Sequence, residues 1–384
     1  MSAFADLPDQ SAKIGAQAMR RVTGSAMEGI LSATAARSRR LADNLVTHAF
    51  GSVIADAALG VAERELETIA MLGALGGCEA QLRTHIGFAL DCGLSPGEVM
   101  ASAEHVSVYA GYPRALTMAR IVEEVAAERG ETLLTARAFA LRDHTTALFD
   151  SGGEKPPMVL LHALGLDWRM WSRVIPHLTA RYRVIAIDLR GFGSAAGGPH
   201  VADLAHYAAD VADLLERLGI ARAHITGLSL GGSIALELGL QRPDLIGGLT
   251  VIAATAWSFP AFEERAQAAE NDGQEAQIIP SLTRWFRPGD LARNDWPTRY
   301  ARNCVRAAST EEWAAAWRVL ATLALEERLD ALEPPVSIIA GEVDRSTPPE
   351  LMRRLAADIT IIPDAPHMIA LTHPEELAKT ILAG

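Results

Sequence analysis

The spacing of apolar residues changes near residue 130, and this change divides the chain into two regions. Before it, apolar residues recur every three to four positions, as on the segment 63–72, which predicts amphipathic helices. Ala, Leu, Glu and Arg dominate this region, and all four are good helix formers. Ser95 and Glu98 flank a Pro-Gly pair in the pattern of a capped helix start, and Gly93 suits the end of the preceding helix. The pattern predicts an all-α domain over residues 1–130.

After residue 130 the apolar residues gather in short runs. Alternation over 135–148 predicts a β-hairpin. Helical patterns at 204–218 and 232–240 separate later runs, and strands that alternate with helices imply a mostly parallel sheet with helices on both faces. The region 131–384 is therefore predicted to be an α/β domain, in which an insertion over about 256–328 forms a helical cap. The predicted strands of the sheet lie at 158–161, 183–188, 223–226, 249–252, 336–339 and 358–362.

Composition narrows the classes of function. A chain of 384 residues is long enough for two domains, and a net charge of −12 with no basic run argues against binding to nucleic acid or anionic lipid. Three cysteines cannot build a disulfide scaffold and suit a reducing compartment. The first residues include acids and a proline, where a secretory signal would need a basic start and an apolar core. The charge-free run 245–262 contains Gly247, Gly248 and Pro260, which favours a buried strand and loop over a membrane span. We expect a cytoplasmic protein with no membrane association.

The motif G-L-S-L-G at residues 227–231 carries the clearest chemical signal. It joins a predicted strand to a predicted helix, where so tight a turn needs flanking glycines and lifts the hydroxyl of Ser229 above the sheet. The N–H of Leu230 opens the helix and would face the oxyanion that forms when Ser229 attacks a carbonyl group. The motif therefore predicts a nucleophile at Ser229 and an oxyanion donor at Leu230.

A serine nucleophile needs a base, and the base needs an acid that orients it. For a nucleophile on this kind of turn, the acid and the histidine follow later in the chain, in that order. Asp344 comes just after the run 336–339, and His367 follows the last predicted strand in a P-H-M turn. We therefore predict Asp344 as the acid and His367 as the base. Glu342 and His373 are weaker alternatives, because Glu342 lies on the preceding turn itself and His373 lies at the start of a terminal helix.

The loop after the first central strand predicts a second oxyanion donor. Its sequence is H-A-L-G at 162–165, and we assign this role to the N–H of Leu164. His162 is interpreted as a structural residue that holds the loop. A Gly-rich loop at 188–194 follows another strand, and a structural role is favoured there too.

The motifs HALG, DLRGFGS, GLSLGG, GEVD and PHM occur in the order expected of an α/β-hydrolase, and the region 131–384 resembles that family throughout. Within the family, the segments 228–232, 285–288 and 346–349 resemble the 3-oxoadipate enol-lactonases and related esterases. The resemblance implies an α/β-hydrolase fold and cleavage of a carboxylic ester or lactone through an acyl-enzyme. A small-molecule ester or lactone is the partner that it implies, and no cofactor is expected.

The predicted cap is rich in tryptophan and arginine. Some of the tryptophans must pack the cap itself, and one or two are expected to line an apolar acyl or lactone pocket. We expect Trp257, Trp285 and Arg287 at this substrate pocket. A local excess of arginine in an acidic chain could bind a substrate carboxylate, although a solvated cap face accounts for it equally well. Five of the seven tryptophans lie here, Trp257, Trp285, Trp296, Trp313 and Trp317, together with Arg284, Arg287, Arg299, Arg302 and Arg306.

Three segments of the first region, 63–70, 81–85 and 109–113, resemble the carboxymuconolactone decarboxylase family over roughly residues 51–128. The resemblance implies an all-helical fold. Members of this family form ring-like trimers or hexamers, so it also implies a homo-oligomer assembled through this domain.

The chemical residues of that family are only partly matched. One branch carries a C-x-x-C-x-x-x-H peroxidase motif, but Gln81 occupies the second cysteine position between Cys78 and His85. A dithiol redox cycle is therefore not expected. For decarboxylation, the family resemblance and the need for an electrophile and a proton donor point to His85, Arg83 and Glu79. Gln81 departs from this pattern too, because an acid is expected at its position.

Two functions follow from the two resemblances. The first is a serine hydrolase of esters or lactones with an oligomerising helical domain. The alternative is a bifunctional 4-carboxymuconolactone decarboxylase and 3-oxoadipate enol-lactonase of protocatechuate breakdown, although the two halves stand in the reverse of the order expected for that fusion. A binding protein on an inactive hydrolase fold is disfavoured, because Ser229, Asp344 and His367 are all present. The histidines are scattered and no H-E-x-x-H motif or cysteine pair occurs, so no metal site is expected.

Overall fold

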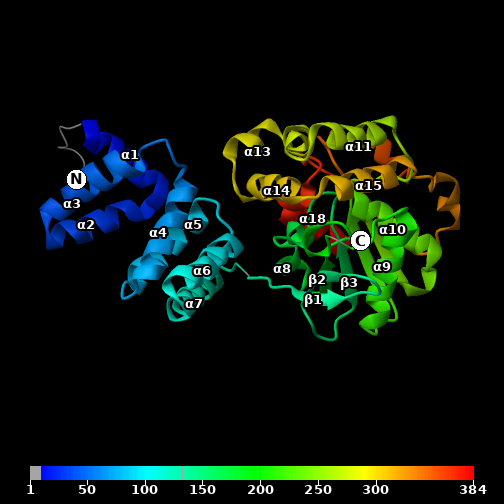
Figure 1. The fold of residues 1–384 in the computed structure, drawn as a ribbon, viewed down its shortest axis with the longest axis horizontal. Helices are drawn as coiled ribbons and strands as arrows, with labels where there is room; N and C mark the ends of the chain where they lie inside the picture. The colour runs from blue at the N-terminus through cyan, green and yellow to red at the C-terminus, as the bar shows by residue number, and fades with distance from the viewer. Residues whose placement is uncertain (1–9, 132, 197) are drawn as a thin grey trace. The chain divides into compact units, whose positions relative to one another are not determined.

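The structure, a computed structural model, describes residues 10–131, 133–196 and 198–384 (Figure 1). The chain divides into two compact units, Met1–Leu133 and Leu134–Gly384. Among the described residues, the first unit contains helices alone and the second combines a sheet with helices. The predicted succession of an all-α region and an α/β region is therefore confirmed.

The first unit, which we call the helical unit, contains the helix start and the helix end that local sequence signals predict at residues 93–98. Ser95 accepts a hydrogen bond from the N–H of Glu98 (3.2 Å), and the Glu98 carboxylate accepts one from the N–H of Ser95 (2.8 Å), which confirms the capping box. Gly93 follows the preceding helix with φ = 85°, a left-handed conformation that suits glycine. The elements are α1 (Gln10–Thr23), η1 (Gly24–Ala26), α2 (Met27–Arg37), α3 (Arg39–Asn44), η2 (Leu45–Ile54), α4 (Val61–Leu75), α5 (Glu79–Asp91), α6 (Pro96–Ala110) and α7 (Tyr112–Glu128).

Two apolar clusters hold the helical unit together. One lies among α4, α5, α6 and α7 and contains the fully buried Ile69, Ile86 and Met118. The other packs α1 and α2 against η2. The backbones of α1 and η2 touch at Gly15, where a Cβ would lie 1.9 Å from the carbonyl oxygen of Val46. The element η2 is a π-helix, which the apolar spacing of a ten-residue stretch does not distinguish from an α-helix.

The second unit, which we call the sheet unit, is organised around an eight-stranded sheet with the order β1-β2-β4-β3-β5-β6-β7-β8. The hairpin of β1 and β2 is present, β2 also pairs antiparallel with β4, and all other pairs are parallel. The central strands are buried along nearly their whole length, as expected for a sheet covered on both faces. The strands are β1 (Arg137–Ala140), β2 (Thr145–Asp150), β3 (Pro157–Leu161), β4 (Arg183–Ile187), β5 (Ala223–Leu228), β6 (Ile246–Ile252), β7 (Val336–Gly341) and β8 (Thr360–Ile362).

Helices cover the sheet, and a further group of helices forms a cap between β6 and β7. Helix α9 packs on α10 and α8 packs on α18, and Figure 1 shows these two pairs on opposite sides of the strands. The helices against the sheet are α8 (Ile175–Leu178), α9 (Leu204–Arg217), α10 (Leu230–Gln241), α16 (Pro349–Met352), α17 (Ile369–Thr372) and α18 (Pro374–Ala383), and the cap helices are α11 (Pro260–Asp272), α12 (Ile278–Trp285), α13 (Pro288–Arg293), α14 (Trp296–Ala307) and α15 (Thr310–Ala321).

The charge-free run 245–262 supplies β6, a loop and the start of α11. It does not form a continuous helix. In the part of the chain that the structure describes, none of the helices combines the length and hydropathy needed to cross a membrane.

Candidate active site

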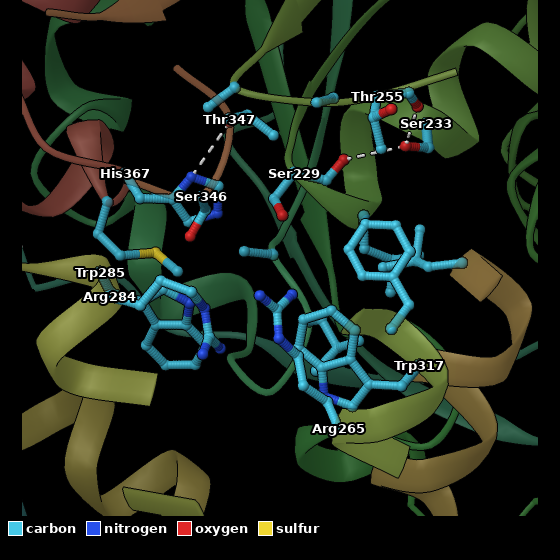
Figure 2. A pocket seen from close by; sticks show the side chains of 18 residues that line it. Ser229, Ser233, Thr255, Arg265, Arg284, Trp285, Trp317, Ser346, Thr347 and His367 are labelled. Atoms are coloured by element: carbon cyan, nitrogen blue, oxygen red, sulfur yellow. Dashed lines mark hydrogen bonds between the residues drawn. The ribbon is translucent and has the colours of Figure 1, made fainter. Parts of the chain in front are cut away.

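Ser229 lies at the sharp turn between β5 and α10. Its backbone has φ = 56° and ψ = −116°, a strained conformation that costs a residue other than glycine about 1–3 kcal/mol. The turn is held because the Ser229 N–H donates to the carbonyl oxygen of Ile252 (2.8 Å), and the Ser229 carbonyl oxygen accepts from the N–H groups of Gly232 (2.9 Å) and Ser233 (3.1 Å). Figure 2 shows Ser229 and His367 beside the same pocket, with the Ser229 side chain projecting into it.

Glycine is required on both sides of this turn. A Cβ on Gly227 would lie 2.1 Å from the carbonyl oxygen of Gly231, and a Cβ on Gly231 would lie 2.3 Å from that of Leu161. Both obstacles are backbone atoms of packed elements, which cannot move aside as a flexible side chain can. The G-x-S-x-G motif therefore secures the close approach of α10 to β3 and β5.

His367 and Asp344 meet because the loops after β8 and β7 lie next to each other. Nδ1 of His367 lies 2.8 Å from Oδ2 of Asp344. Oδ1 of Asp344 accepts hydrogen bonds from the N–H groups of Ser346 (2.6 Å) and Thr347 (3.0 Å), and the Thr347 hydroxyl donates to Oδ2 (2.8 Å). Asp344 is 4% exposed and His367 is 2% exposed. These contacts hold the carboxylate in one orientation against the imidazole.

The electrostatics of the pair favour an ionised carboxylate. Burial alone would raise the pKa of Asp344, but the His367 ring and the donors of Thr347 together lower it below its ordinary value. An ionised Asp344 accepts a hydrogen bond from Nδ1–H of His367, which leaves Nε2 unprotonated and able to accept a proton. His367 and Ser229 line the same pocket, so this nitrogen can serve a reaction at Ser229.

Leu230 and Leu164, the two expected oxyanion donors, also line this pocket. Leu230 is the first residue of α10, so its N–H has no partner within the helix. Leu164 belongs to the loop that follows β3. The two residues therefore border the space in which a carbonyl group attacked by Ser229 would lie.

His162 holds the loop that carries Leu164. Nδ1 of His162 lies 2.8 Å from the carbonyl oxygen of Ala163, and Nε2 accepts a hydrogen bond from the N–H of Leu189 (2.7 Å). Burial lowers the pKa of His162 to about 4, so the ring is neutral at pH 7. On the loop 188–194, Asp188 accepts two backbone hydrogen bonds (2.9 and 2.7 Å). Both loops thus use buried polar side chains as structural supports.

Cap residues line the side of the pocket that faces Ser229. Figure 2 shows Arg265, Arg284, Trp285 and Trp317 there. Trp285 is one of the three residues expected at the substrate pocket. Arg265 is absent from the predicted residues, although it lies three positions after the buried Phe262 on α11, so the helical period places it near the buried face.

Trp257 and Arg287, the other two residues expected at this pocket, do not line it. The Trp257 ring packs against Arg354, whose Cζ lies 3.8 Å from the ring centroid. Arg287 pairs with Asp290 (2.9 Å) and with Asp364. These acids already neutralise Arg287, which therefore caps the start of α13 and does not face the substrate pocket.

The two alternatives to the acid and the base have other partners. Glu342 accepts a hydrogen bond from the N–H of Asp364 (2.8 Å). Nδ1 of His373 lies 2.9 Å from the Thr372 hydroxyl, just before α18. Neither Glu342 nor His373 lines the pocket of Ser229. The geometry therefore favours Asp344 and His367 over these alternatives.

The three residues predicted for decarboxylation, His85, Arg83 and Glu79, each bind a different partner in the helical unit. Arg83 on α5 pairs with Glu124 and with Glu128 (2.9 Å), both on α7. Glu79 accepts a hydrogen bond from a backbone N–H of the preceding loop (3.2 Å). Two carboxylates thus neutralise Arg83, which leaves it poorly suited to bind a substrate anion.

His85, the third candidate, is paired with Glu65, an acid outside the predicted set. Nδ1 of His85 lies 2.9 Å from Oε2 of Glu65, which is 2% exposed. Glu65 precedes the buried Ile69 by one turn of α4, and this position on the buried face is the signal that could have identified it. The Sγ of Cys78 lies 3.3 Å from the carbonyl oxygen of Leu72.

Among the described residues, Asp143, His144 and Asp210 form the one group close enough to share a metal ion. Arg190 occupies the space between the two acids, because its guanidinium donates to Asp143 (2.7 Å) and to Asp210 (2.6 Å). The group is therefore a closed network of ion pairs and does not fit a metal ion.

Each of the two units matches the model of a known protein family. Residues 156–374 match the model of the α/β hydrolase fold, and residues 40–124 match that of the carboxymuconolactone decarboxylase family. 3-Oxoadipate enol-lactonase 1 of Acinetobacter baylyi is 30% identical over 230 residues, which cover 58% of this chain and 86% of that protein. A pimeloyl-acyl-carrier-protein methyl ester esterase of Methylococcus capsulatus is 30% identical over 254 residues, covering 60% of this chain and 95% of that protein. The crystal structure of the enol-lactonase from Burkholderia xenovorans LB400 is 25% identical and has a TM-score of 0.60, covering 64% of this chain and 98% of that one. The chain belongs to the α/β-hydrolase family and carries an N-terminal domain of the carboxymuconolactone decarboxylase family.

Proposed function

We propose that the sheet unit is a serine hydrolase of carboxylic esters or lactones, with Ser229 as nucleophile, His367 as base and Asp344 as the orienting acid. The observation that carries the proposal is the buried 2.8 Å contact between Asp344 and His367, because His367 lines a pocket that also contains the strained Ser229. Relatives named as an enol-lactonase and a methyl ester esterase support the class of substrate.

In the first half-reaction, Oγ of Ser229 attacks the substrate carbonyl carbon while Nε2 of His367 takes the hydroxyl proton. Asp344 stabilises the imidazolium that forms. The carbonyl oxygen gains a negative charge and is bound by the N–H groups of Leu230 and Leu164, where each donor contributes about 10²- to 10³-fold in rate. His367 then gives its proton to the alcohol oxygen, and the bond between this oxygen and the carbonyl carbon breaks. The acyl group remains on Ser229.

In the second half-reaction, a water molecule attacks the acyl-enzyme. His367 takes one proton from the water, and the same two N–H groups bind the second oxyanion. When the intermediate collapses, His367 returns the proton to Oγ of Ser229 and the carboxylic acid leaves. With a lactone, the alcohol and the acid belong to one molecule, so the ring opens and a single product forms.

Replacing the nucleophile tests this proposal. Ser229→Ala should reduce hydrolysis of p-nitrophenyl butyrate by at least about 10³-fold. Ser258→Ala is the matched control, because Ser258 is an exposed serine of the same unit. A fluorophosphonate probe should add its mass to the native chain and to the control but not to Ser229→Ala. Retained turnover in Ser229→Ala would overturn the assignment.

We also propose that the helical unit joins copies of the chain. Large apolar side chains face solvent on α4, α6 and α7, and such a group is seldom left exposed on a monomer. The end of α4 meets the start of α7, because a Cβ on Gly76 would touch the guanidinium of Arg114. The exposed apolar side chains belong to the last turns of α4 and α6 and to the first turns of α7. They are Met71, Leu75, Val108, Tyr109, Tyr112 and Leu116, with exposed fractions from 63% to 83%.

Decarboxylation by the helical unit is a second candidate function, which the family match over residues 40–124 and the His85–Glu65 pair favour. His85 could give a proton to the carbon that loses carbon dioxide. Incubation with 4-carboxymuconolactone tests the idea. Release of carbon dioxide that His85→Gln removes would support it, and no release from protein that hydrolyses esters would reject it.

A further inference from the structure

The pocket beside Ser229 contains two arginines without an acidic partner within 4.0 Å among the described residues. Arg265 on α11 places its Cζ 4.7 Å from the ring centroid of Trp317, and Arg284 on α12 places its Cζ 5.7 Å from the same centroid. Arg284 donates one hydrogen bond to the carbonyl oxygen of Pro280 (3.2 Å), but its buried Nε has no hydrogen-bond partner. Figure 2 shows Arg265 extending into the pocket between Trp317 and Ser229.

This arrangement differs from that of the exposed arginines in the same cap. Several of those side chains bind acids at the surface of the cap. Two of them, Arg306 with Glu275 and Arg318 with Glu270, do so through two hydrogen bonds each. Acids are thus available in the cap for some of its arginines, whereas Arg265 and Arg284, which line the pocket, have none within 4.0 Å among the described residues.

Two adjacent, partly buried cations without an acidic partner among the described residues are unfavourable. Burial lowers the pKa of Arg265, and burial followed by repulsion from Arg265 lowers the pKa of Arg284 to about 9. Both guanidinium groups still carry their charges near neutral pH. Contact with the Trp317 ring offsets part of the cost. An anionic ligand would offset far more, because it would balance the charges and bond the free N–H groups.

We propose that Arg265 and Arg284 bind a carboxylate of the substrate, a few bonds away from the carbonyl group that Ser229 attacks. The proposal rests on the proposed hydrolase function, because it names the substrate class of that same site. A chain with net charge −12 would repel an anion from a neutral pocket, so local positive charge is needed to admit one. The rest of the lining includes apolar side chains that suit a short aliphatic linker, namely Phe262, Leu320 and Met368. The preferred substrates are thus half-esters of dicarboxylic acids and lactones with a carboxylate side chain.

A pair of esters of similar length separates charge recognition from general activity. The p-nitrophenyl half-ester of glutaric acid carries the carboxylate, and p-nitrophenyl hexanoate is its neutral counterpart. Arg265→Met and Arg284→Met should each lower kcat/KM for the half-ester about 10- to 100-fold, the usual cost of losing a charged hydrogen-bond partner. For hexanoate, the loss of kcat/KM in the same variants should be much smaller than for the half-ester, because no charge is recognised there. Arg265→Lys should restore part of the loss, since it keeps the charge.

Arg306→Met is the matched control, because it removes the same charge from the cap surface. It should leave both substrates unaffected. An equal loss on both substrates in the Arg265 and Arg284 variants would overturn the proposal, and so would an equal loss on the half-ester in Arg306→Met. Binding of glutarate to Ser229→Ala, measured by titration calorimetry, needs no turnover. If Ser229→Ala binds glutarate and the further change Arg265→Met abolishes the binding, the carboxylate site is supported even if the nucleophile is another residue. If Ser229→Ala does not bind glutarate, the carboxylate site is rejected even if Ser229 proves to be the nucleophile.

Discussion

Asp344→Asn tests the orientation of His367 with a very small change of shape. Oδ1 of Asp344 accepts hydrogen bonds from the N–H groups of Ser346 (2.6 Å) and Thr347 (3.0 Å), so the asparagine must keep its oxygen at that position. Its amide nitrogen then takes the place of Oδ2, 2.8 Å from Nδ1 of His367. A donor at this point pairs with an unprotonated Nδ1, so the ring proton moves to Nε2 and the base that faces Ser229 is lost.

We expect kcat to fall about 10³- to 10⁴-fold, which corresponds to about 4 to 5.5 kcal/mol of lost transition-state stabilisation. The Thr347 hydroxyl, which donates to Oδ2 (2.8 Å), can rotate and accept from the new amide, so the fold should be kept. KM should change little, because Asp344 does not line the pocket. Initial rates with p-nitrophenyl butyrate give both constants, and a thermal unfolding curve checks the fold.

Glu342→Gln is the control, because Glu342 is the other acid that follows β7 and its carboxylate accepts a hydrogen bond from the N–H of Asp364, away from His367. Its kcat should stay within about twofold of the native value. If folded Asp344→Asn kept more than a tenth of the native kcat, the reasoning about the tautomer of His367 would be refuted. If Glu342→Gln instead lost activity, Glu342 would be the acid.

Three further predictions test the turn, a buried histidine and the helical surface. Gly231→Ala should lower the free energy of unfolding, measured in urea, by about 3 kcal/mol or more, because the new Cβ would lie 2.3 Å from a backbone oxygen. Gly247→Ala is the control and should be nearly neutral, because its Cβ would lie 3.5 Å from the nearest atom. Burial lowers the pKa of His162 to about 4. As the pH falls, His162 therefore takes up a proton in the unfolded chain before it does so in the folded chain. The stability due to the neutral ring is complete above pH 6.5 and is lost as the pH falls toward 4. Between pH 7 and 4.5 the native chain should therefore lose about 2 to 3 kcal/mol more than His162→Gln does; parallel losses would contradict this. Tyr109→Glu combined with Tyr112→Glu should reduce the molar mass measured by light scattering, because both residues belong to the proposed interface. Leu41→Glu changes an exposed apolar residue of α3 and should leave the mass unchanged. An unchanged mass in the double tyrosine variant would contradict the proposed interface.

The positions of Ser229, Asp344 and His367 could be predicted from the sequence because the topology of a parallel sheet places them. Ser229 follows β5 directly, Asp344 and His367 lie on the loops after β7 and β8, and parallel strands end at the same edge of the sheet. Only the identity of the strands has to be inferred, and short apolar runs separated by helical patterns identify them well. The hydrogen bonds that fix Asp344, above all those from Thr347, were not predicted, because they depend on the exact course of a loop.

The pocket wall could not be predicted in the same way, because the cap is made of short helices. Arg284 and Arg287 are three positions apart, and on one continuous helix they would share a face. However, α12 ends at Trp285 and α13 begins at Pro288, so the chain turns between the two arginines. One then lines the pocket and the other pairs with Asp290. Apolar periodicity shows that helices are present, but it does not give the rotation of a short helix.

Two buried ionic sites in this chain show how a structural charge can be distinguished from one that serves a ligand. Glu65 is nearly inaccessible and has His85 as its partner, so its burial is explained by the fold alone. The pair therefore does not by itself require a substrate. Arg265 and Arg284 lie close together and half-buried, with no acid within 4.0 Å among the described residues, so the fold alone does not account for their cost. An unbalanced charge of this kind in the pocket of the strained Ser229 is the stronger indication of a ligand, and for this reason the specificity of the protein should be sought in the cap of the sheet unit.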